Sequence, residues 1–137
     1  MLVMAVPGPP SGRETRTKED DVQYLILLYD DEANGPQPGT PDWDKMMEGY
    51  DTATKTFRDD GVMVAGQALE GVASATSVRK RNGKVETMDG PFAETKEALG
   101  GYYLLDCPDL DAALRYAAMI PAAETGTVEV RPIMQFA

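Results

Sequence analysis

The chain contains no histidine and only one cysteine, Cys107, among its 137 residues. Histidine is the side chain that most often exchanges protons near neutral pH, and it is the commonest metal ligand. A zinc site generally needs several Cys or His side chains, and a single cysteine cannot form an intramolecular disulfide. We therefore expect no metal site, no cofactor and no disulfide, so that carboxylate, phenol, amine or thiol groups would carry any proton transfer.

Basic residues and long apolar runs are also scarce. The chain has 13 Lys and Arg residues against 23 Asp and Glu residues, which gives a net charge of −10. Such a chain repels phosphate backbones and anionic lipid headgroups. No apolar run approaches the roughly 20 residues that cross a bilayer, and nothing in the cysteine content points to an oxidising compartment. These features predict a cytoplasmic protein that binds neither nucleic acid nor membranes.

The chain has the length of a single domain. Residues 1–21 mix Pro, Gly and charged residues after a short apolar start, and we expect a flexible tail there. Residues 22–137 then form the domain. The apolar periodicity and the turn residues predict its elements in this order: a strand at 24–29, a helix from Thr40 to Gly61, a strand at 62–67, a hairpin at 76–88, a strand at 99–106, a helix after Pro108 and a strand at 128–134.

Local signals mark the ends of these elements. Thr40 followed by Pro41 is typical of a helix N-cap and first helical position. Asn82-Gly83 is the dipeptide that best suits a two-residue hairpin turn, and strand alternation then places Arg79 and Arg81 on one face of the hairpin. In the second helix, helical spacing predicts an apolar stripe made of Leu110, Ala113, Leu114 and Ala117.

This order of elements is a split βαβ repeat with an inserted hairpin, which predicts a ferredoxin-like α+β sandwich. Both helices would cover one face of the sheet. The other face would then expose large apolar side chains unless something buries it, so we expect a homodimer that packs through its sheets. The apolar residues that argue for this are Leu25, Leu27, Val62, Val64, Tyr102 and Leu104.

The segment Asp89–Glu97 is the strongest candidate for a site, with the sequence DGPFAETKE. Pro91 stiffens the backbone, and the neighbouring Phe92 could raise the pKa of the Asp89 carboxyl by desolvation, which suits an acid or base. Asp before Gly-Pro is equally typical of a turn former that bonds its own backbone. Glu94, Lys96 and Glu97 would form a charged wall of the pocket, although a solvated loop explains each of them alone.

Three further residues could bind a ligand. Arg79 and Arg81 would suit a carboxylate or phosphate, because a guanidinium group binds such anions through two parallel hydrogen bonds. A surface role in ion pairs is the competing interpretation for both. Tyr50 lies on the apolar side of the first predicted helix, where its phenol could donate a hydrogen bond to a ligand or simply pack in the core.

The chain resembles the YCII-related proteins of the DGPF type over roughly residues 22 to 136. The resemblance rests on Asp89–Glu97, on Leu99–Leu104 (LGGYYL) and on Val128–Pro132 (VEVRP). It implies a dimeric α+β barrel in which two sheets face one another. Shorter members of the family have a proposed His and Asp active site; because this chain has Tyr50 at about the position of the histidine, only Asp89 can be carried over.

Two functions from different classes follow. The first is a small-molecule site in a cofactor-independent lyase or isomerase, which would act on a cyclic or aromatic organic acid with Asp89 moving a proton. The second is a non-catalytic ligand-binding or regulatory module, since DGPF-type proteins are often associated with extracytoplasmic-function sigma factors. The residues alone leave open whether the chain is an enzyme, and they name no substrate.

Overall fold

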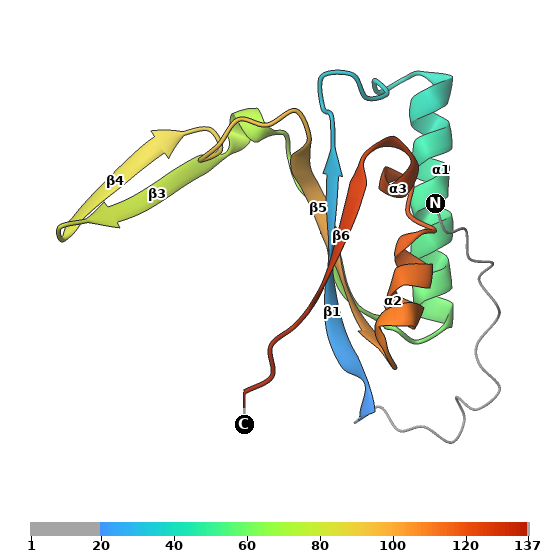
Figure 1. Ribbon diagram of the computed structural model, residues 1–137. Coiled ribbons are helices and arrows are strands. Elements are labelled where there is room, and N and C mark those ends of the chain that lie inside the picture. Colours follow the sequence, from blue (N-terminus) through green and yellow to red (C-terminus); the bar gives the residue numbers. More distant parts are fainter. Residues whose placement is uncertain (1–19, 137) are drawn as a thin grey trace.

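A computed structural model describes residues 20–136 (Figure 1). We expected a flexible tail at residues 1–21, and residues 1–19 of it lie outside the described residues. The elements follow in this order: β1 (Val22–Asp30), α1 (Pro41–Asp59), β2 (Met63–Ala68), a 3-10 helix (Val72–Ser74), β3 (Thr76–Arg81), β4 (Lys84–Asp89), β5 (Ala98–Cys107), α2 (Leu110–Ala117), α3 (Ala122–Thr125) and β6 (Thr127–Pro132).

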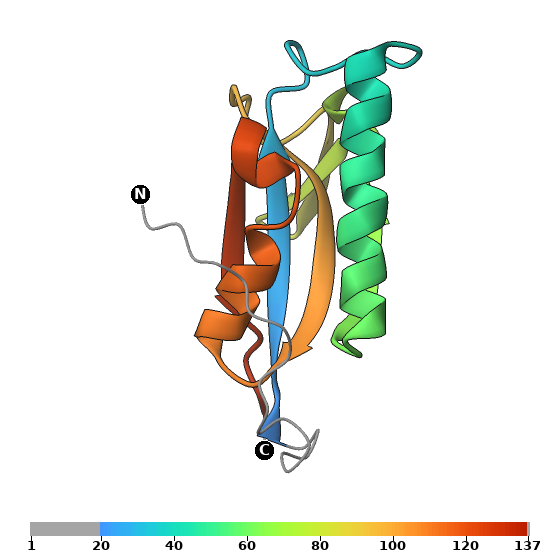
Figure 2. The same cartoon turned by 90° about the vertical axis from the view of Figure 1, so that its right-hand side faces the viewer.

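Four strands form an antiparallel sheet in the order β2-β5-β1-β6. The helices α1, α2 and α3 all lie on one face of this sheet, as the two views show (Figures 1 and 2). Two crossovers with their helices on one side of a sheet of this order define the ferredoxin-like arrangement. The predicted α+β fold is therefore confirmed, and the sheet of the single chain is open rather than closed into a barrel.

The core lies between the sheet and the helices. Strand alternation directs Tyr24, Ile26 and Leu28 of β1 toward the helices, and all three are buried. Phe57 of α1 is fully buried at the centre and meets the ring of Tyr103 edge-on at 5.1 Å. Every second residue along the middle strands thus contributes to a single apolar layer.

Helix α1 begins and ends where the sequence predicts. The Thr40 side chain accepts a hydrogen bond from the backbone N–H of Trp43 at 3.2 Å, and Pro41 occupies the first turn, where it has no N–H to leave unpaired. Gly61 follows the helix with a positive φ of 70°. None of the helices within residues 20–136 is long and apolar enough to cross a lipid bilayer.

The predicted apolar stripe of α2 is wrong in phase. Leu110 and Leu114 are exposed, whereas Ala113 and Ala117 are buried as expected. Tyr116 takes the place of the leucines, because its ring meets Phe57 edge-on at 5.6 Å and its hydroxyl donates to Asp60 Oδ2 at 2.7 Å. Small alanines let the helix approach the sheet closely, and a phenol can be buried there because its O–H has a partner.

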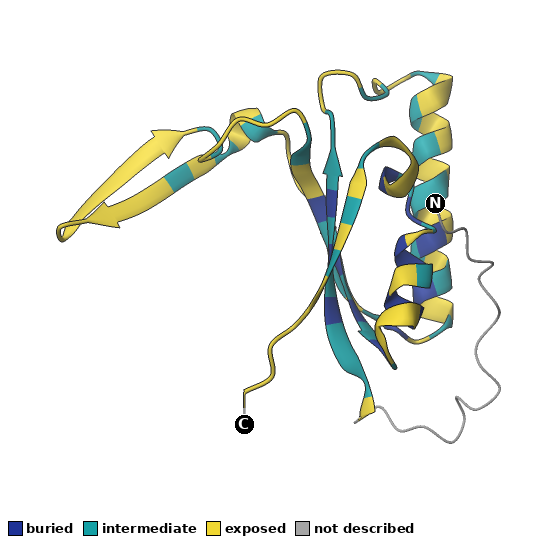
Figure 3. Ribbon diagram, in the orientation of Figure 1, coloured by how far each residue is buried: buried dark blue, intermediate teal, exposed yellow. Residues whose placement is uncertain are grey.

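The strands β3 and β4 form a separate two-stranded sheet, which we call the hairpin arm (residues 76–89). It turns at Asn82 and Gly83, which have φ angles of 50° and 77°, as the predicted two-residue turn requires. The arm extends away from the body, and it is almost entirely exposed (Figure 3).

None of the helices within residues 20–136 lies on the second face of the sheet, which we call the helix-free face. Its centre consists of Leu25 and Leu27 of β1, which pair with Leu104 and Tyr102 of β5. All four are half-buried within one chain. Val62, which the sequence analysis placed among these residues, is instead fully buried in the core. It precedes β2 and its backbone N–H donates to the carbonyl of Phe57 at 3.0 Å, which holds it under the helix.

Candidate functional site

An open groove with a volume of about 1120 Å³ lies where the hairpin arm joins the body. Its lining comes from residues 68–75, which connect β2 to the arm, and from residues 91–99, which connect the arm to β5. Tyr29 of β1 also lines it. We call Asp89–Glu97 the signature segment; it and the connection at residues 68–75 therefore supply the two walls of one concave site.

The lining is largely apolar. The polar side chains at the groove are the carboxylates of Glu70, Glu94 and Glu97, the hydroxyls of Ser74 and Thr95, and the phenol of Tyr29. Among residues 20–136, no Lys or Arg lines the groove. The apolar lining residues are Ala68, Leu69, Val72, Ala75, Pro91, Phe92, Ala93, Ala98 and Leu99.

Hydrogen bonds hold the wall at residues 68–75 in place. The backbone N–H of Val72 donates to the carboxylate of Glu32, at 3.2 and 3.3 Å from its two oxygens. Ser74 Oγ donates to Glu70 Oε1 at 3.1 Å, and the N–H of Leu69 donates to the carbonyl of Gly100 at 2.9 Å. The wall is thus tied both to the loop after β1 and to β5.

The junction between arm and groove depends on Gly90. Its backbone N–H donates to the carbonyl of Ala75 at 2.7 Å, and its carbonyl accepts from Ser77 Oγ at 2.9 Å. The φ angle of Gly90 is 92°, a region that L side chains rarely adopt. The glycine of the signature segment therefore closes the base of the arm and directs the following residues into the groove wall.

The structure brings together only part of the predicted site. Phe92 and Glu94 line the groove, and Phe92 is 75% exposed. Asp89 is the last residue of β4, where it pairs with Thr76, and it lies beside the groove without lining it. Its side chain is exposed, and the catalytic role predicted for it stays a prediction. No hydrogen bond to its carboxylate is found within residues 20–136.

Lys96 does not line the groove, and its charge acts on Asp31 in the loop after β1. The pKa of Asp31 is lowered, first by a hydrogen bond from the Asn34 side chain at 2.7 Å and further by the backbone N–H of Ala33 and the charge of Lys96. The binding role predicted for Lys96 stays a prediction.

Arg79 and Arg81 lie on the hairpin arm, as predicted on one face, opposite Glu86 and Lys84. Both side chains are exposed, and neither lines the groove of its own chain. Within one chain, the two guanidinium groups and the signature segment are therefore separate features.

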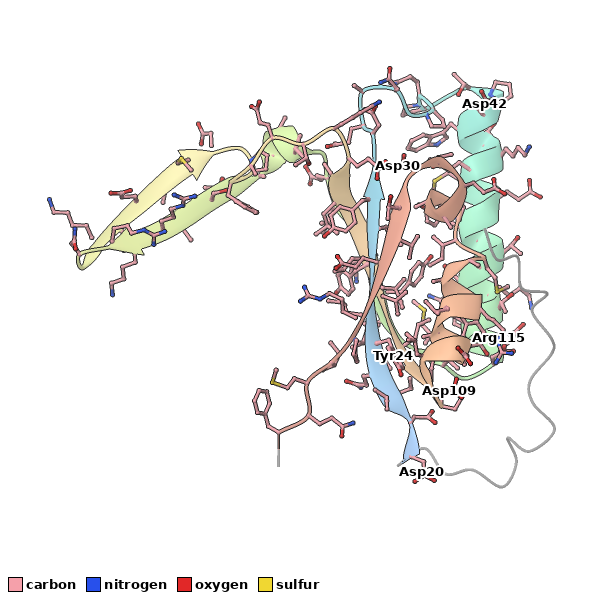
Figure 4. All side chains as sticks on the ribbon, in the orientation of Figure 1. Asp20, Tyr24, Asp30, Asp42, Asp109 and Arg115 are labelled. Carbon is pink, nitrogen blue, oxygen red and sulfur yellow. The ribbon has the colours of Figure 1, made fainter. Side chains whose placement is uncertain are left out.

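Tyr50 lies on the helix side of the sheet, away from the groove. Burial raises its pKa to about 12, and the negative charge of Asp30 and the phenol of Tyr103 act in the same direction. Asp30, at the end of β1 (Figure 4), also accepts a hydrogen bond from Thr125 Oγ1 at 2.7 Å. Tyr50 is partly buried and packs against the core, and the binding role predicted for it stays a prediction.

The comparison with known proteins can now be set beside this geometry. Residues 22–137 match the YCII-related domain. The chain belongs to the YCII-related family. A relative in Rhizobium meliloti (strain 1021), described as an uncharacterised protein, is 35% identical over 112 residues, which cover 80% of this chain and 90% of the relative. The family membership predicted from Asp89–Glu97 is thereby confirmed, and that relative brings no described activity with it.

The sequence analysis missed half of the groove. Residues 68–75 supply Leu69, Glu70 and Val72, yet they form a connection without strong periodicity. Their position directly before a hairpin was the available signal, because a hairpin brings the chain on either side of it together. Within residues 20–136, no three His, Cys, Asp or Glu side chains come together as a metal ion would need, so the three glutamates are spread along the walls.

Proposed function

We propose that the groove at the base of the hairpin arm is a binding site for a small organic molecule. The observation that carries this proposal is a concave, mainly apolar lining with a few polar groups, which is the usual character of small-molecule sites. The signature segment supports the same interpretation, because Gly90 fixes the turn that places Phe92 and Glu94 on one wall.

The charges of the groove indicate the kind of ligand. Glu70, Glu94 and Glu97 contribute three carboxylates, and none of the described basic side chains lines the groove. A bound carboxylate would be repelled by these groups, whereas an ammonium or another donor group would be attracted. We therefore infer an apolar ligand with a cationic or hydrogen-bond-donating end, in place of the organic acid that the family resemblance suggested.

A second candidate function is proton transfer by Asp89. Its exposed carboxylate ends β4 two residues before Pro91, the first residue of the signature segment that lines the groove. A ligand that extends beyond the groove could reach it. If Asp89 transfers a proton in this way, the chain is a lyase or isomerase. The non-catalytic module, with or without a sigma factor as partner, would use the same groove to sense a ligand without changing it.

We further propose that two copies of the chain pack through their helix-free faces. The centre of this face is apolar, with Leu25, Leu27, Tyr102 and Leu104 beside one another on paired strands. Along the edge strand β6 lie Glu129 and Arg131, which pair with Leu27 and Leu25. A two-fold axis places the same patch on both sides, so apolar centres would meet and the charged edges could pair.

Three probes of similar size but different charge test the groove: phenethylamine, phenylethanol and phenylacetate. We expect the amine to bind most tightly and the acid most weakly, as measured by isothermal titration calorimetry on the full chain. Phe92→Ala should weaken amine binding by about fivefold or more because an aromatic contact is lost. Glu94→Gln should reduce the preference for the amine over the alcohol.

Two controls make this test specific. Glu86→Gln removes a carboxylate from the exposed arm and should leave binding unchanged. Asp89→Asn should also leave probe binding unchanged if the groove alone binds, whereas loss of binding or of turnover in that variant would place Asp89 in the site. Tighter binding of phenylacetate than of phenethylamine would contradict the proposed ligand class.

A further inference from the structure

The hairpin arm is an unusual element because it contacts so little of its own chain. Its two strands pair with each other and with no other strand among residues 20–136. Figure 1 shows that the arm extends from the sheet toward the side opposite the helices. The arm and the helix-free face therefore enclose an angle. A second molecule packed on that face would lie within reach of the arm.

The arm exposes apolar side chains that its own chain does not cover. Val78 and Val85 are 66% and 65% exposed, and the register places both on the same face of the arm, diagonally across the two strands. Met88, on the other face, is 45% exposed. A two-stranded hairpin is marginally stable on its own in water and usually needs a further surface to pack against. The composition of the arm thus calls for a contact surface.

The tip of the arm has the opposite charge to the rest of the chain. Four of the 13 basic residues lie within Arg79–Lys84, a stretch without any acid, while the chain carries 23 acidic residues elsewhere. None of these four forms an ion pair within residues 20–136. An acidic surface would attract the tip, and a second copy of this chain, with its net charge of −10, supplies one.

We propose that the hairpin arm clasps a second copy of the chain. The second copy occupies the angle between the helix-free face and the arm; the Val78 and Val85 face packs against it, and the basic tip lies on its acidic surface. This inference rests on the proposed dimer. That dimer could form through the helix-free faces alone, and the inference adds that the arm of each chain reaches over the other chain. Nucleic acid is a poorer occupant, because the remainder of the chain would repel it.

The arm can be removed without cutting the body. Because Gly90 N–H donates to the carbonyl of Ala75 at 2.7 Å, residues 76–89 can be replaced by two glycines that join these positions. We would measure the dissociation constant of the dimer by sedimentation velocity for the wild type and for this shortened chain, with circular dichroism to verify the fold. The clasp predicts at least about a hundredfold weaker dimer, since two arms are lost.

A charge variant keeps the arm and tests its tip. Lys80 lies on the same face of the arm as Val78 and Val85, and Arg81 and Lys84 flank the turn. Lys80→Glu, Arg81→Glu and Lys84→Glu together should weaken the dimer by about tenfold or more and abolish the weakening by salt expected for the wild type. Lys45→Glu, an exposed basic residue on α1 at the helix side, is the matched control and should have no effect.

The outcomes separate the two proposals. An unchanged dissociation constant in both the shortened chain and the charge variant overturns the clasp and leaves the dimer through the helix-free faces intact. A wild-type chain that stays monomeric up to high micromolar concentration overturns both. If the shortened chain fails to fold, the charge variant decides alone, because it alters only exposed side chains.

Discussion

The body and the hairpin arm of this chain are held together by different means. In the body, Phe57 is fully buried and meets Tyr103 and Tyr116 edge-on, and helices α1 and α2 begin at side-chain caps. The arm has six cross-strand pairs and a tight turn, but no buried residue. The body is stabilised by tertiary packing, whereas the shape of the arm depends on local pairing alone.

This difference indicates where function can be placed. A packed core fixes atoms within small tolerances, while an exposed hairpin opens at little free-energy cost. The groove lies where the two regions meet, with Leu69 and Leu99 at the ends of body strands and Phe92 at the base of the arm. We therefore expect substitutions to divide into those that unfold the chain and those that alter only the arm.

The largest effect should come from the centre of the body. Phe57→Ala removes a fully buried ring, so the free energy of unfolding should fall by about 3–5 kcal/mol. Urea unfolding followed by circular dichroism measures this loss. Val78→Ala on the arm is the matched control. At a protein concentration low enough for the chain to be monomeric, its effect should stay within about 0.5 kcal/mol. An equal cost for both variants would mean that the arm and the body unfold as a single cooperative unit.

A smaller effect is expected at the start of α1. Thr40→Ala removes the side-chain oxygen that accepts from Trp43 N–H, which should cost about 1 kcal/mol of stability. Thr40→Ser should retain most of the stability, because serine provides the same acceptor. If the serine variant loses as much as the alanine variant, the cap does not contribute in the way described.

The third effect depends on pH. The pKa of Tyr50 is raised to about 12 in the folded chain, above the ordinary value of about 10. Its stabilising contribution is therefore complete below pH 10 and is lost as the pH rises through about 12. Tyr50→Phe should flatten the fall in unfolding free energy between these pH values. Identical slopes in the two proteins would rule out this source of the pH dependence.

The smallest effect on overall stability should come from the turn of the arm. Gly83→Ala introduces a Cβ at a φ of 77°, which strains the turn by about 1–2 kcal/mol. At a low protein concentration, the free energy of global unfolding should stay unchanged, while amide hydrogen exchange in residues 76–89 accelerates. A decrease in the free energy of global unfolding equal to this strain would mean that the arm and the body unfold as one cooperative unit.

Much of the fold could be predicted because its signals are local. Thr40 and Pro41 marked the start of α1, Asn82-Gly83 marked the turn of the arm, and the order of elements then left few topologies. The phase of α2 could not be predicted in this way. Alanines carry little periodic signal, and the burial of Tyr116 depends on Phe57 and Asp60, which lie far away in the sequence.

The site was harder to predict than the fold. Phe92 and Glu94 lie close together in the signature segment, and both line the groove. The wall at residues 68–75 is held by Glu32, a contact between residues 40 positions apart that no local pattern encodes. Tyr50 was placed correctly on the apolar side of α1, but that side packs on the sheet rather than on a ligand cavity.

The hydrogen bond between Gly90 and Ala75 also has a consequence for how such a chain can change over evolutionary time. Entry to and exit from the arm lie next to each other, so the arm can gain or lose pairs of residues without altering the spacing of β2 and β5 in the sheet. Related chains are therefore free to differ in arm length and in tip sequence, and selection on partner choice can act there while selection on folding acts on the body.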